Sequence, residues 1–332
     1  MSSSHKNPLL RLHRPLVLFA VSMGVLALIS AVGIVVDDRI LVGVPIWSKP
    51  FKFSVSFLAY ALSLAWMLSL LPRGRRLGWW AGTVVAVASA GEMVLITLQV
   101  IRGKRSHFNN ATPFDDTVFQ VMGATVVLLW LGALVIAVLL LRAKILDRAM
   151  AWAVRLSSLI ALAGAAVGFL MVRPTPEQLE VEESPITGAH AVGVPDGGPS
   201  MPLTGWASNG GDLRIPHFFG MHALQLLPLL LLVLAALAPR FARLADEHVR
   251  LRLTLTASAA YTATFALLTW QALRGQALFA PDGATLAGAG AIALLGGASA
   301  ALSFREASPS PSPSPPSPSP STPAPFEEEV TS

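Results

Sequence analysis

The sequence predicts an all-α fold: a polytopic integral membrane helix bundle of about eight transmembrane helices. Of the 332 residues, 53% are hydrophobic and only 13% are charged, whereas a soluble protein carries about 25% charged residues. The apolar residues are also gathered into long runs of about 20, the length that an α-helix needs to cross the hydrocarbon core of a bilayer. The lipid bilayer is therefore the first partner that the sequence predicts.

Eight runs meet this length. In chain order they cover residues of about 15–36, 53–71, 78–101, 117–141, 150–172, 217–238, 250–273 and 280–303. The first run follows a basic segment, as in a signal peptide. At about 22 residues the run is too long for the apolar core of a signal peptide, and no small-x-small cleavage site precedes Asp37. We therefore expect an uncleaved helix. The last run is rich in glycine and alanine, which suits close helix packing in lipid.

Lysine and arginine in the short loops favour a plasma-membrane or inner-membrane protein with both termini in the cytoplasm. On this topology the basic cytoplasmic residues are Lys6, Arg11, Arg14, Arg73, Arg75, Arg76, Arg142, Lys144, Arg148, Arg240, Arg243, Arg250 and Arg252. The first two outer loops are as basic as the first two inner ones. Either the bias is weak, or the outer cations have another role.

The chain divides into three parts. Residues 1–14 are a cytoplasmic N-terminus, residues 15–304 are the bundle, and residues 305–332 are a Pro/Ser-rich tail of the kind that is disordered and extended in solvent. A long outer loop at about 173–215 interrupts the bundle. Loops of this length are usually functional or disordered, and we expect disorder in its first part.

Polar residues gather in the outer halves of the predicted helices. A carboxylate inside the membrane costs about 2.5–3.5 kcal/mol even on a lenient scale, so Glu92 should face the bundle interior or water, with a partner. Gln99 lies seven residues further on and returns to nearly the same helix face. The two residues are expected to line one surface of an internal cavity. A structural carboxyl, hydrogen-bonded between helices, is the alternative for Glu92.

The stretch GGDLRIPHFFGMHALQLLPL, residues 210–229, places ionisable groups where lipid should begin. His222 and Gln225 share a helix face and are expected to meet Glu92 across the bundle, whereas His217, nearer the mouth, could join His107. Interfacial placement or an interhelical hydrogen bond is the structural alternative for these histidines. We predict proton exchange or catalysis for Glu92 and His222.

Several cations are expected at the outer mouth, where arginine and lysine side chains would capture an anion. They are Lys49, Lys52, Arg102, Arg105 and Arg214. Anchoring at the membrane interface is the alternative for the segment WSKPFKF. The other predicted ligand-binding residues are Trp47, Gln99, His107, Asn109, Trp206, Asp212, His217 and Gln225.

These features favour an outward-facing pocket with a basic rim, which binds a small anionic or amphiphilic ligand. Both simple binding and a reaction on the ligand are compatible with this prediction. Three alternatives stay open: a secondary transporter, a scaffold or assembly factor, and a redox protein whose haem or metal is held by His107 with His217 or His222. The chain has no cysteine, which excludes disulfides and thiolate sites. It has no Walker A, H-E-x-x-H or G-x-S-x-G motif, and no aromatic-basic motif that would predict a nucleic-acid partner.

Overall fold

The computed structural model describes residues 12–305. Within them, eight α-helices of more than 20 residues run along the bundle; they are α1 (Arg14–Val36), α2 (Ser48–Ser69), α3 (Arg75–Ile101), α4 (Pro113–Arg142), α5 (Arg148–Met171), α7 (Arg214–Leu237), α8 (Glu247–Leu273) and α9 (Gly283–Arg305). Seven of these are long and apolar enough to cross a membrane, the exception being the threonine-rich α8. The predicted all-α, multi-pass membrane bundle is confirmed. The assignments to residues 1–11 and 306–332 lie outside the described residues.

Several helices begin earlier than their apolar runs predict, and three of them position the candidate site. Helix α2 begins at Ser48, α4 at Pro113 and α7 at Arg214, so each extends a polar first turn beyond the apolar stretch. Local chemistry allows this at α4, where the Thr112 side chain accepts a hydrogen bond from the Asp115 amide and Pro113 needs no amide partner. These three first turns lie at one end of the bundle and position the candidate site.

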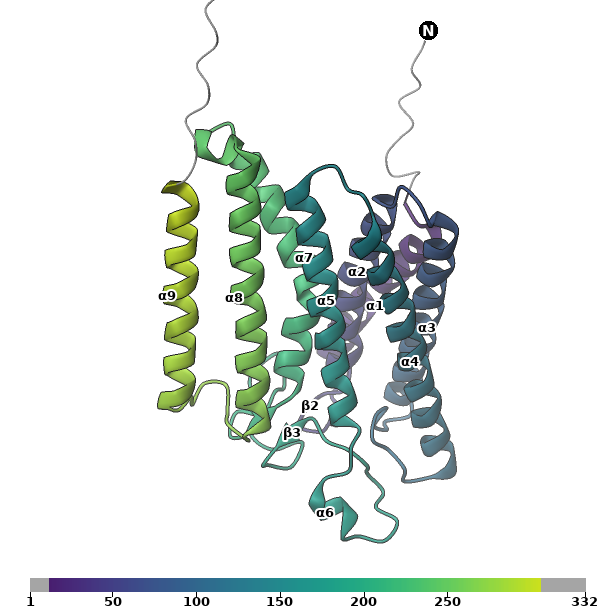
Figure 1. The fold of residues 1–332 in the computed structure, drawn as a ribbon. Helices are drawn as coiled ribbons and strands as arrows, with labels where there is room; N and C mark the ends of the chain where they lie inside the picture. The colour runs from purple at the N-terminus through teal and green to yellow at the C-terminus, as the bar shows by residue number, and fades with distance from the viewer. Residues whose placement is uncertain (1–11, 306–332) are drawn as a thin grey trace, which may run out of the picture.

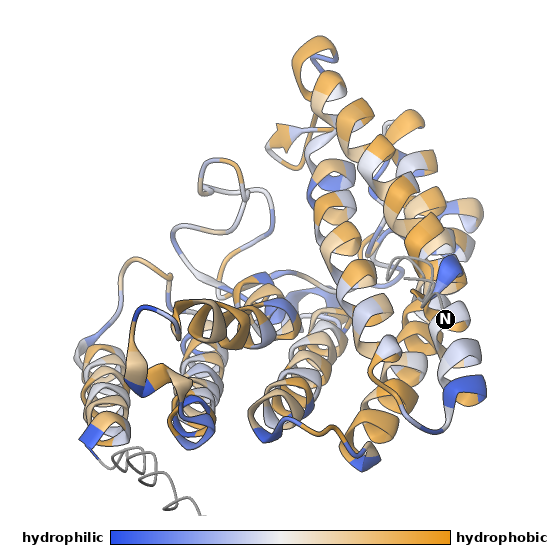
Figure 2. Cartoon of the chain, turned by 90° about the horizontal axis from the view of Figure 1, so that it is seen from above, coloured by the Kyte–Doolittle hydropathy of each residue, from blue (hydrophilic) through white to orange (hydrophobic). Residues whose placement is uncertain are grey.

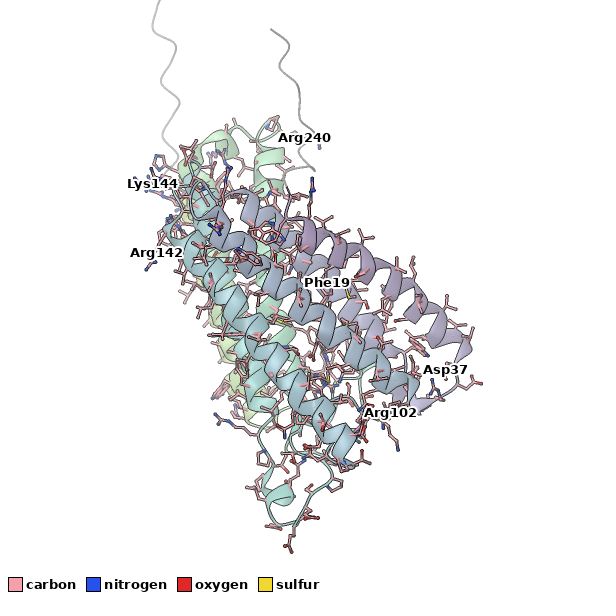
Figure 3. The ribbon with its side chains drawn as sticks, turned by 90° about the vertical axis from the view of Figure 1, so that its right-hand side faces the viewer. Phe19, Asp37, Arg102, Arg142, Lys144 and Arg240 are labelled. Carbon is pink, nitrogen blue, oxygen red and sulfur yellow. The ribbon has the colours of Figure 1, made fainter. Side chains whose placement is uncertain are left out.

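The helices pack mainly as antiparallel neighbours: α1 with α2, α3 with α4, α5 with α7, and α8 with α9. In Figure 1, α9 and α8 form one edge and α3 and α4 the other, with α5 and α7 between them. Both ends of the described chain lie at one end of the bundle, and residues 172–213 lie at the opposite end, here called the loop end (Figure 1). The basic residues Arg142, Lys144 and Arg240 lie far from the loop end, which carries Asp37 and Arg102 (Figure 3).

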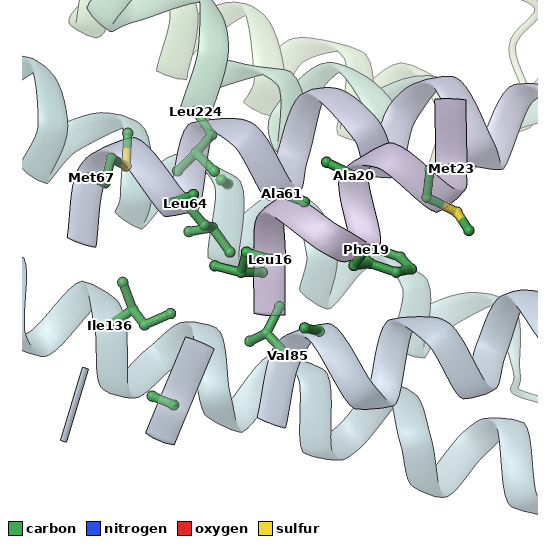
Figure 4. Close-up of a cluster of buried hydrophobic side chains, with 14 of the residues drawn as sticks. Leu16, Phe19, Ala20, Met23, Ala61, Leu64, Met67, Val85, Ile136 and Leu224 are labelled. Carbon is green, nitrogen blue, oxygen red and sulfur yellow. The ribbon is translucent and has the colours of Figure 1, made fainter. Parts of the chain in front are cut away.

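The largest buried cluster among the described residues joins six helices, α1 to α5 and α7, and Figure 4 shows part of it. It includes Leu16, Phe19, Ala20 and Met23 of α1, Ala61, Leu64 and Met67 of α2, Val85 of α3, Ile136 of α4 and Leu224 of α7. The outer faces of the helices are also apolar, with Leu28 72% and Val35 80% exposed. Figure 2 shows hydrophobic residues along the helices and hydrophilic residues mostly at their ends. Helices that are apolar on every side belong in lipid rather than in water.

Helices α5 and α7 approach each other most closely at two glycines. A methyl group built on Gly164 would lie 2.6 Å from the Gly220 Cα atom, and one built on Gly220 would lie 2.5 Å from the Gly164 Cα atom. Their backbones therefore touch without side chains between them, as small residues permit in membrane bundles. This crossing fixes the position of the first turns of α7.

Residues 172–213 follow a defined path over the loop end. Helix α6 (Pro176–Leu179) begins with a capping box between Thr175 and Gln178, and the Gln178 side chain bonds both backbone groups of Gly188. Strand β3 (Ala191–Val192) pairs with β4 (Gly211–Asp212), and β1 (Ile40–Leu41) pairs with β2 (Val44–Pro45) in a second short hairpin. The expected disorder in the first part of the loop is not found, because side chains satisfy its backbone groups.

Candidate functional site

A cavity of about 130 Å³ opens at the loop end. Its walls come from the first turns of α2 and α7, the β1–β2 hairpin, the connection between α3 and α4, and residues 190–207. Phe53, Trp206 and Phe218 form an apolar part of the wall, and the rings of Trp206 and Phe218 are stacked with centroids 6.4 Å apart. We refer to this cavity as the pocket.

Cations outnumber carboxylates in the pocket. It is lined by Lys49, Lys52, Lys104, Arg105 and Arg214, with Asp196 as the one carboxylate in the lining. Arg214 is neutralised by Asp212, 2.5 Å away, and Lys52 donates to the Thr204 carbonyl. Among the described residues, the side chains of Lys104 and Arg105 have no hydrogen bond or ion pair. The pocket therefore holds positive charge that the protein itself does not balance.

A chain of polar contacts leads from the pocket into the bundle. The Lys49 Nζ atom is 3.1 Å from His107 Nδ1, and His107 Nε2 is 3.5 Å from Glu92 Oε1, slightly beyond the usual hydrogen-bond range. The other carboxyl oxygen of Glu92 accepts from the Thr125 hydroxyl at 2.9 Å. The structure thus places His107 and Thr125 beside Glu92, where His222 and Gln225 were predicted, and connects Lys49 to it through His107.

Burial lowers the pKa of His107 well below its ordinary value, and the neighbouring Lys49, His190 and His217 lower it further. The ring is therefore neutral at pH 7, with one N–H and one bare nitrogen. When Lys49 is an ammonium it can only donate, so Nδ1 must accept and the hydrogen sits on Nε2, facing Glu92. The Ser106 hydroxyl, also 3.1 Å from Nδ1, can donate to the same nitrogen, so both contacts favour this tautomer.

His190 and Asp196 form a second pair in the pocket wall, with His190 Nδ1 2.9 Å from Asp196 Oδ2. Burial lowers the pKa of His190 by more than Asp196 raises it. Burial would raise the pKa of Asp196, but bonds from the His190 ring and the backbone amides of His190 and Ala191 hold that pKa well below its ordinary range. The pair holds residues 190–196 in place at the wall of the pocket.

These pKa shifts predict that the protein loses stability in acid. In the unfolded chain, histidines bind protons as pH falls through about 6.5, whereas folded His107 and His190 resist protonation. The unfolded state then holds more protons than the folded state, so the free energy of unfolding decreases as pH is lowered from about 6.5. Protonation of Asp196 decreases it further at lower pH. Thermal unfolding in detergent between pH 8 and pH 5 measures this. A flat profile in that interval, or one unchanged in His190→Gln, contradicts the prediction.

Three other predicted site residues lie in networks of their own. Gln99 is fully buried and donates to Asp115 Oδ1 at 2.9 Å, and Arg102 reaches the same oxygen at 2.5 Å. Asn109 is buried and donates to the Arg105 carbonyl. Neither Gln99 nor Arg102 lines the pocket, so Gln99 does not share a surface there with Glu92. They tie the end of α3 to the start of α4.

Trp47 and the two histidines of α7 are also satisfied outside the pocket lining. Trp47 donates to Asp37 at 2.8 Å and covers Gly33. His217 contacts the Gly164 carbonyl at 2.8 Å, and His222 contacts Gln225 at 3.2 Å. His222 and Gln225 are thus paired with each other, and no contact joins them to Glu92. Within residues 12–305 there is no group of three or more histidine and acidic side chains placed to hold a metal ion.

The sequence reasoning missed several pocket residues: Phe53, Lys104, Ser106, His190, Asp196 and Phe218. Lys104 could have been found, since it lies between two residues that were selected, Arg102 and Arg105, in the segment RGKRSH. His190 and Asp196 could not be found, because the sequence of a Gly/Pro-rich loop does not distinguish a polar residue that lines a pocket from one that is exposed to solvent.

No protein-family model, curated protein or solved structure matches this chain, so its function has to be inferred from the pocket itself.

Proposed function

We propose that this multi-pass membrane protein binds a small anion, or the anionic group of an amphiphile, in the pocket. The observation that carries the proposal is the pair of unbalanced cations, Lys104 and Arg105, beside Lys49. Within residues 12–305, the one hydrogen-bond partner of the Lys49 amino group is the neutral imidazole of His107. Guanidinium and ammonium groups form their strongest hydrogen bonds with carboxylate and phosphate oxygens. An anion in the pocket would complete contacts that the protein leaves unmade.

The aromatic wall supports a ligand with an apolar part. Phe53, Trp206 and Phe218 line the pocket together with the cations, and pockets for organic ligands combine such apolar walls with a few polar groups that fix orientation. Phe53 and Phe218 meet edge to face with centroids 6.3 Å apart, which gives the wall a rigid shape. A carboxylate or phosphate attached to a short hydrocarbon fits this division.

We further propose that the loop end faces the outside. Arg142, Lys144 and Arg240 lie at the opposite end of the bundle (Figure 3), which the bias of basic residues toward the cytoplasm makes the inner end. The pocket would then receive ligands from the outer aqueous phase or from the outer leaflet.

Calorimetric titration of the protein in nanodiscs tests the binding proposal, with inorganic phosphate and dodecyl phosphate as separate ligands. A charge-assisted hydrogen bond contributes about 1.5–3 kcal/mol, and 1.4 kcal/mol is a tenfold change in Kd. We therefore expect Lys104→Gln/Arg105→Gln to weaken binding by about tenfold or more. Tighter binding of dodecyl phosphate would identify an amphiphile, and equal binding a free anion.

Lys144→Gln is the matched control, because Lys144 is an exposed cation at the other end of the bundle. The affinity of this variant for each ligand should equal that of the unmodified protein. Binding of neither ligand, or an equal loss of affinity in Lys144→Gln and in the double variant, contradicts the proposed function.

A further inference from the structure

Glu92 is a carboxyl group in the bundle interior with one oxygen left unsatisfied. Its side chain is 2% exposed, and Oε1 has no hydrogen-bond partner. A buried ionised carboxylate normally has full hydrogen bonding or a close cation, because burial of an unpaired charge is costly. Here the His107 imidazole nitrogen that faces Oε1 is neutral and 3.5 Å away. This environment suits an uncharged carboxyl at least as well as a charged one.

The contacts of Thr125 also favour a protonated Glu92. Its hydroxyl lies 2.9 Å from Glu92 Oε2 and 2.8 Å from the Met122 carbonyl. A hydroxyl has one hydrogen to donate, so it cannot donate to both oxygens at once. Both contacts are made together when the carboxyl carries the proton and donates to Thr125, while Thr125 donates to Met122.

Lys49, His107 and Glu92 together allow two arrangements of the same protons. In the first, Lys49 is an ammonium, His107 carries its hydrogen on Nε2, and Glu92 is ionised. In the second, Lys49 has given a proton to Nδ1, His107 has given its Nε2 proton to Glu92 Oε1, and both ends are neutral; a half-turn of the carboxyl group then carries its O–H to Thr125. Two N–H bonds break and one N–H and one O–H bond form, so the total charge is unchanged and no other reactant is needed.

We propose that Glu92 is a proton-binding site coupled to the pocket through His107. With the pocket empty, the proton rests on Glu92 and Lys49 is neutral; an anion beside Lys49 draws the proton back to Lys49 and leaves Glu92 ionised. This inference rests on the proposed function, since it requires an anion in the pocket. It makes a proton the second ligand of the protein.

Burial favours the neutral arrangement in an empty pocket, because it disfavours the charged form at both Lys49 and Glu92. Lys52 and Arg214 also repel an ammonium at Lys49, whereas Glu92 and Asp196 attract one. His107 faces Lys49, His190 and His217, and Glu92 faces Lys49 and Thr125. Separating an ion pair from water costs more than its attraction returns unless further contacts help. An anion beside Lys49 supplies such a contact.

Infrared difference spectroscopy tests the coupling directly, with inorganic phosphate as the probe because it has no carboxyl group. Adding phosphate to the purified protein is expected to remove the C=O band of a protonated carboxyl and to add carboxylate bands. The change should be absent in Glu92→Gln and present in Glu177→Gln, which alters an exposed acid in α6. Should Glu92→Gln fail to fold, Thr125→Val removes the hydroxyl contact and is expected to shift the same C=O band.

The outcomes separate this inference from the proposed function. If calorimetry detects phosphate binding but the carboxyl bands do not change, the coupling is overturned and the pocket remains an anion site. The coupling also fails if the bands change equally in Glu92→Gln, or if Thr125→Val leaves the band in place. If only dodecyl phosphate binds, it replaces inorganic phosphate in the infrared measurement, since it too has no carboxyl group. If neither ligand binds, neither proposal holds.

Discussion

Gly164→Ala is expected to lower the free energy of unfolding by about 3 kcal/mol, at the upper end of the cost of overpacking a core. The new methyl group would lie 2.6 Å from the Gly220 Cα atom and 2.6 Å from the Met221 nitrogen. Backbone atoms cannot move aside as the end of a side chain can, so α5 and α7 must separate. The separation would also pull the Gly164 carbonyl away from His217, which contacts it at 2.8 Å.

Gly123→Ala is the matched control. Gly123 is also a helical glycine within a membrane span, but an added methyl group there meets no atom within 4 Å. Alanine has the higher helix propensity, so the control should be as stable as the unmodified protein. The measurement is thermal unfolding in detergent, followed by the folded fraction in size-exclusion chromatography. Equal stability of the two variants would mean that α5 and α7 are not in backbone contact.

The helices could be predicted because the signal for each one is local. An apolar run of about 20 residues has to satisfy its own backbone hydrogen bonds in lipid, so it forms a helix whatever its neighbours are. The first residues of the helices were predicted less accurately, because the polar first turns of α2, α4 and α7 lie beyond the apolar runs. Caps or tertiary contacts hold these turns.

The candidate site could be predicted only in part. Lys49, Lys52, Arg105, Trp206 and Arg214 were selected because charged and aromatic residues are unusual at the edge of a membrane span, and all five line the pocket. Their partners could not be read from the sequence. The spacing of Glu92 and Gln99 is the same whether the two face one cavity or, as found, Gln99 turns to Asp115. His107 reaches Glu92 through the turn between α3 and α4, which no helical periodicity describes.

Arg214→Met is expected to be the most damaging change at the pocket, with a loss of about 3–5 kcal/mol, the usual cost of leaving one partner of a buried ion pair without the other. Asp212 is 0% exposed. It accepts from Arg214 Nε at 2.9 Å and from the Ala207 amide at 2.8 Å. Arg214 also donates to the Gly205 carbonyl. Methionine would keep the aliphatic part of the side chain and remove the guanidinium donors, which leaves Asp212 only the backbone amides of Ala207 and Arg214.

An exposed pair at the same end of the bundle provides the control. Arg39 and Asp37 are 2.7 Å apart, with side-chain exposures of 47% and 20%. Exposed ion pairs contribute little, because water and salt screen them. Arg39→Met should therefore change the unfolding temperature far less than Arg214→Met. If the two variants lose equal stability, the cost does not come from burial of the Asp212 charge.

The double variant Asp212→Asn/Arg214→Met separates the cost of the stranded charge from the value of the ion pair. Asparagine keeps an oxygen that accepts from the Ala207 amide, but it carries no charge to leave unpaired. We expect the double variant to recover more than half of the stability that Arg214→Met loses, while the pocket, which has lost a cation, still binds phosphate less tightly than the unmodified protein. Recovery of stability together with full affinity would place Arg214 outside the anion site. A double variant no more stable than Arg214→Met would show instead that the guanidinium stabilises the loop mainly through Gly205, with Asp212 contributing little.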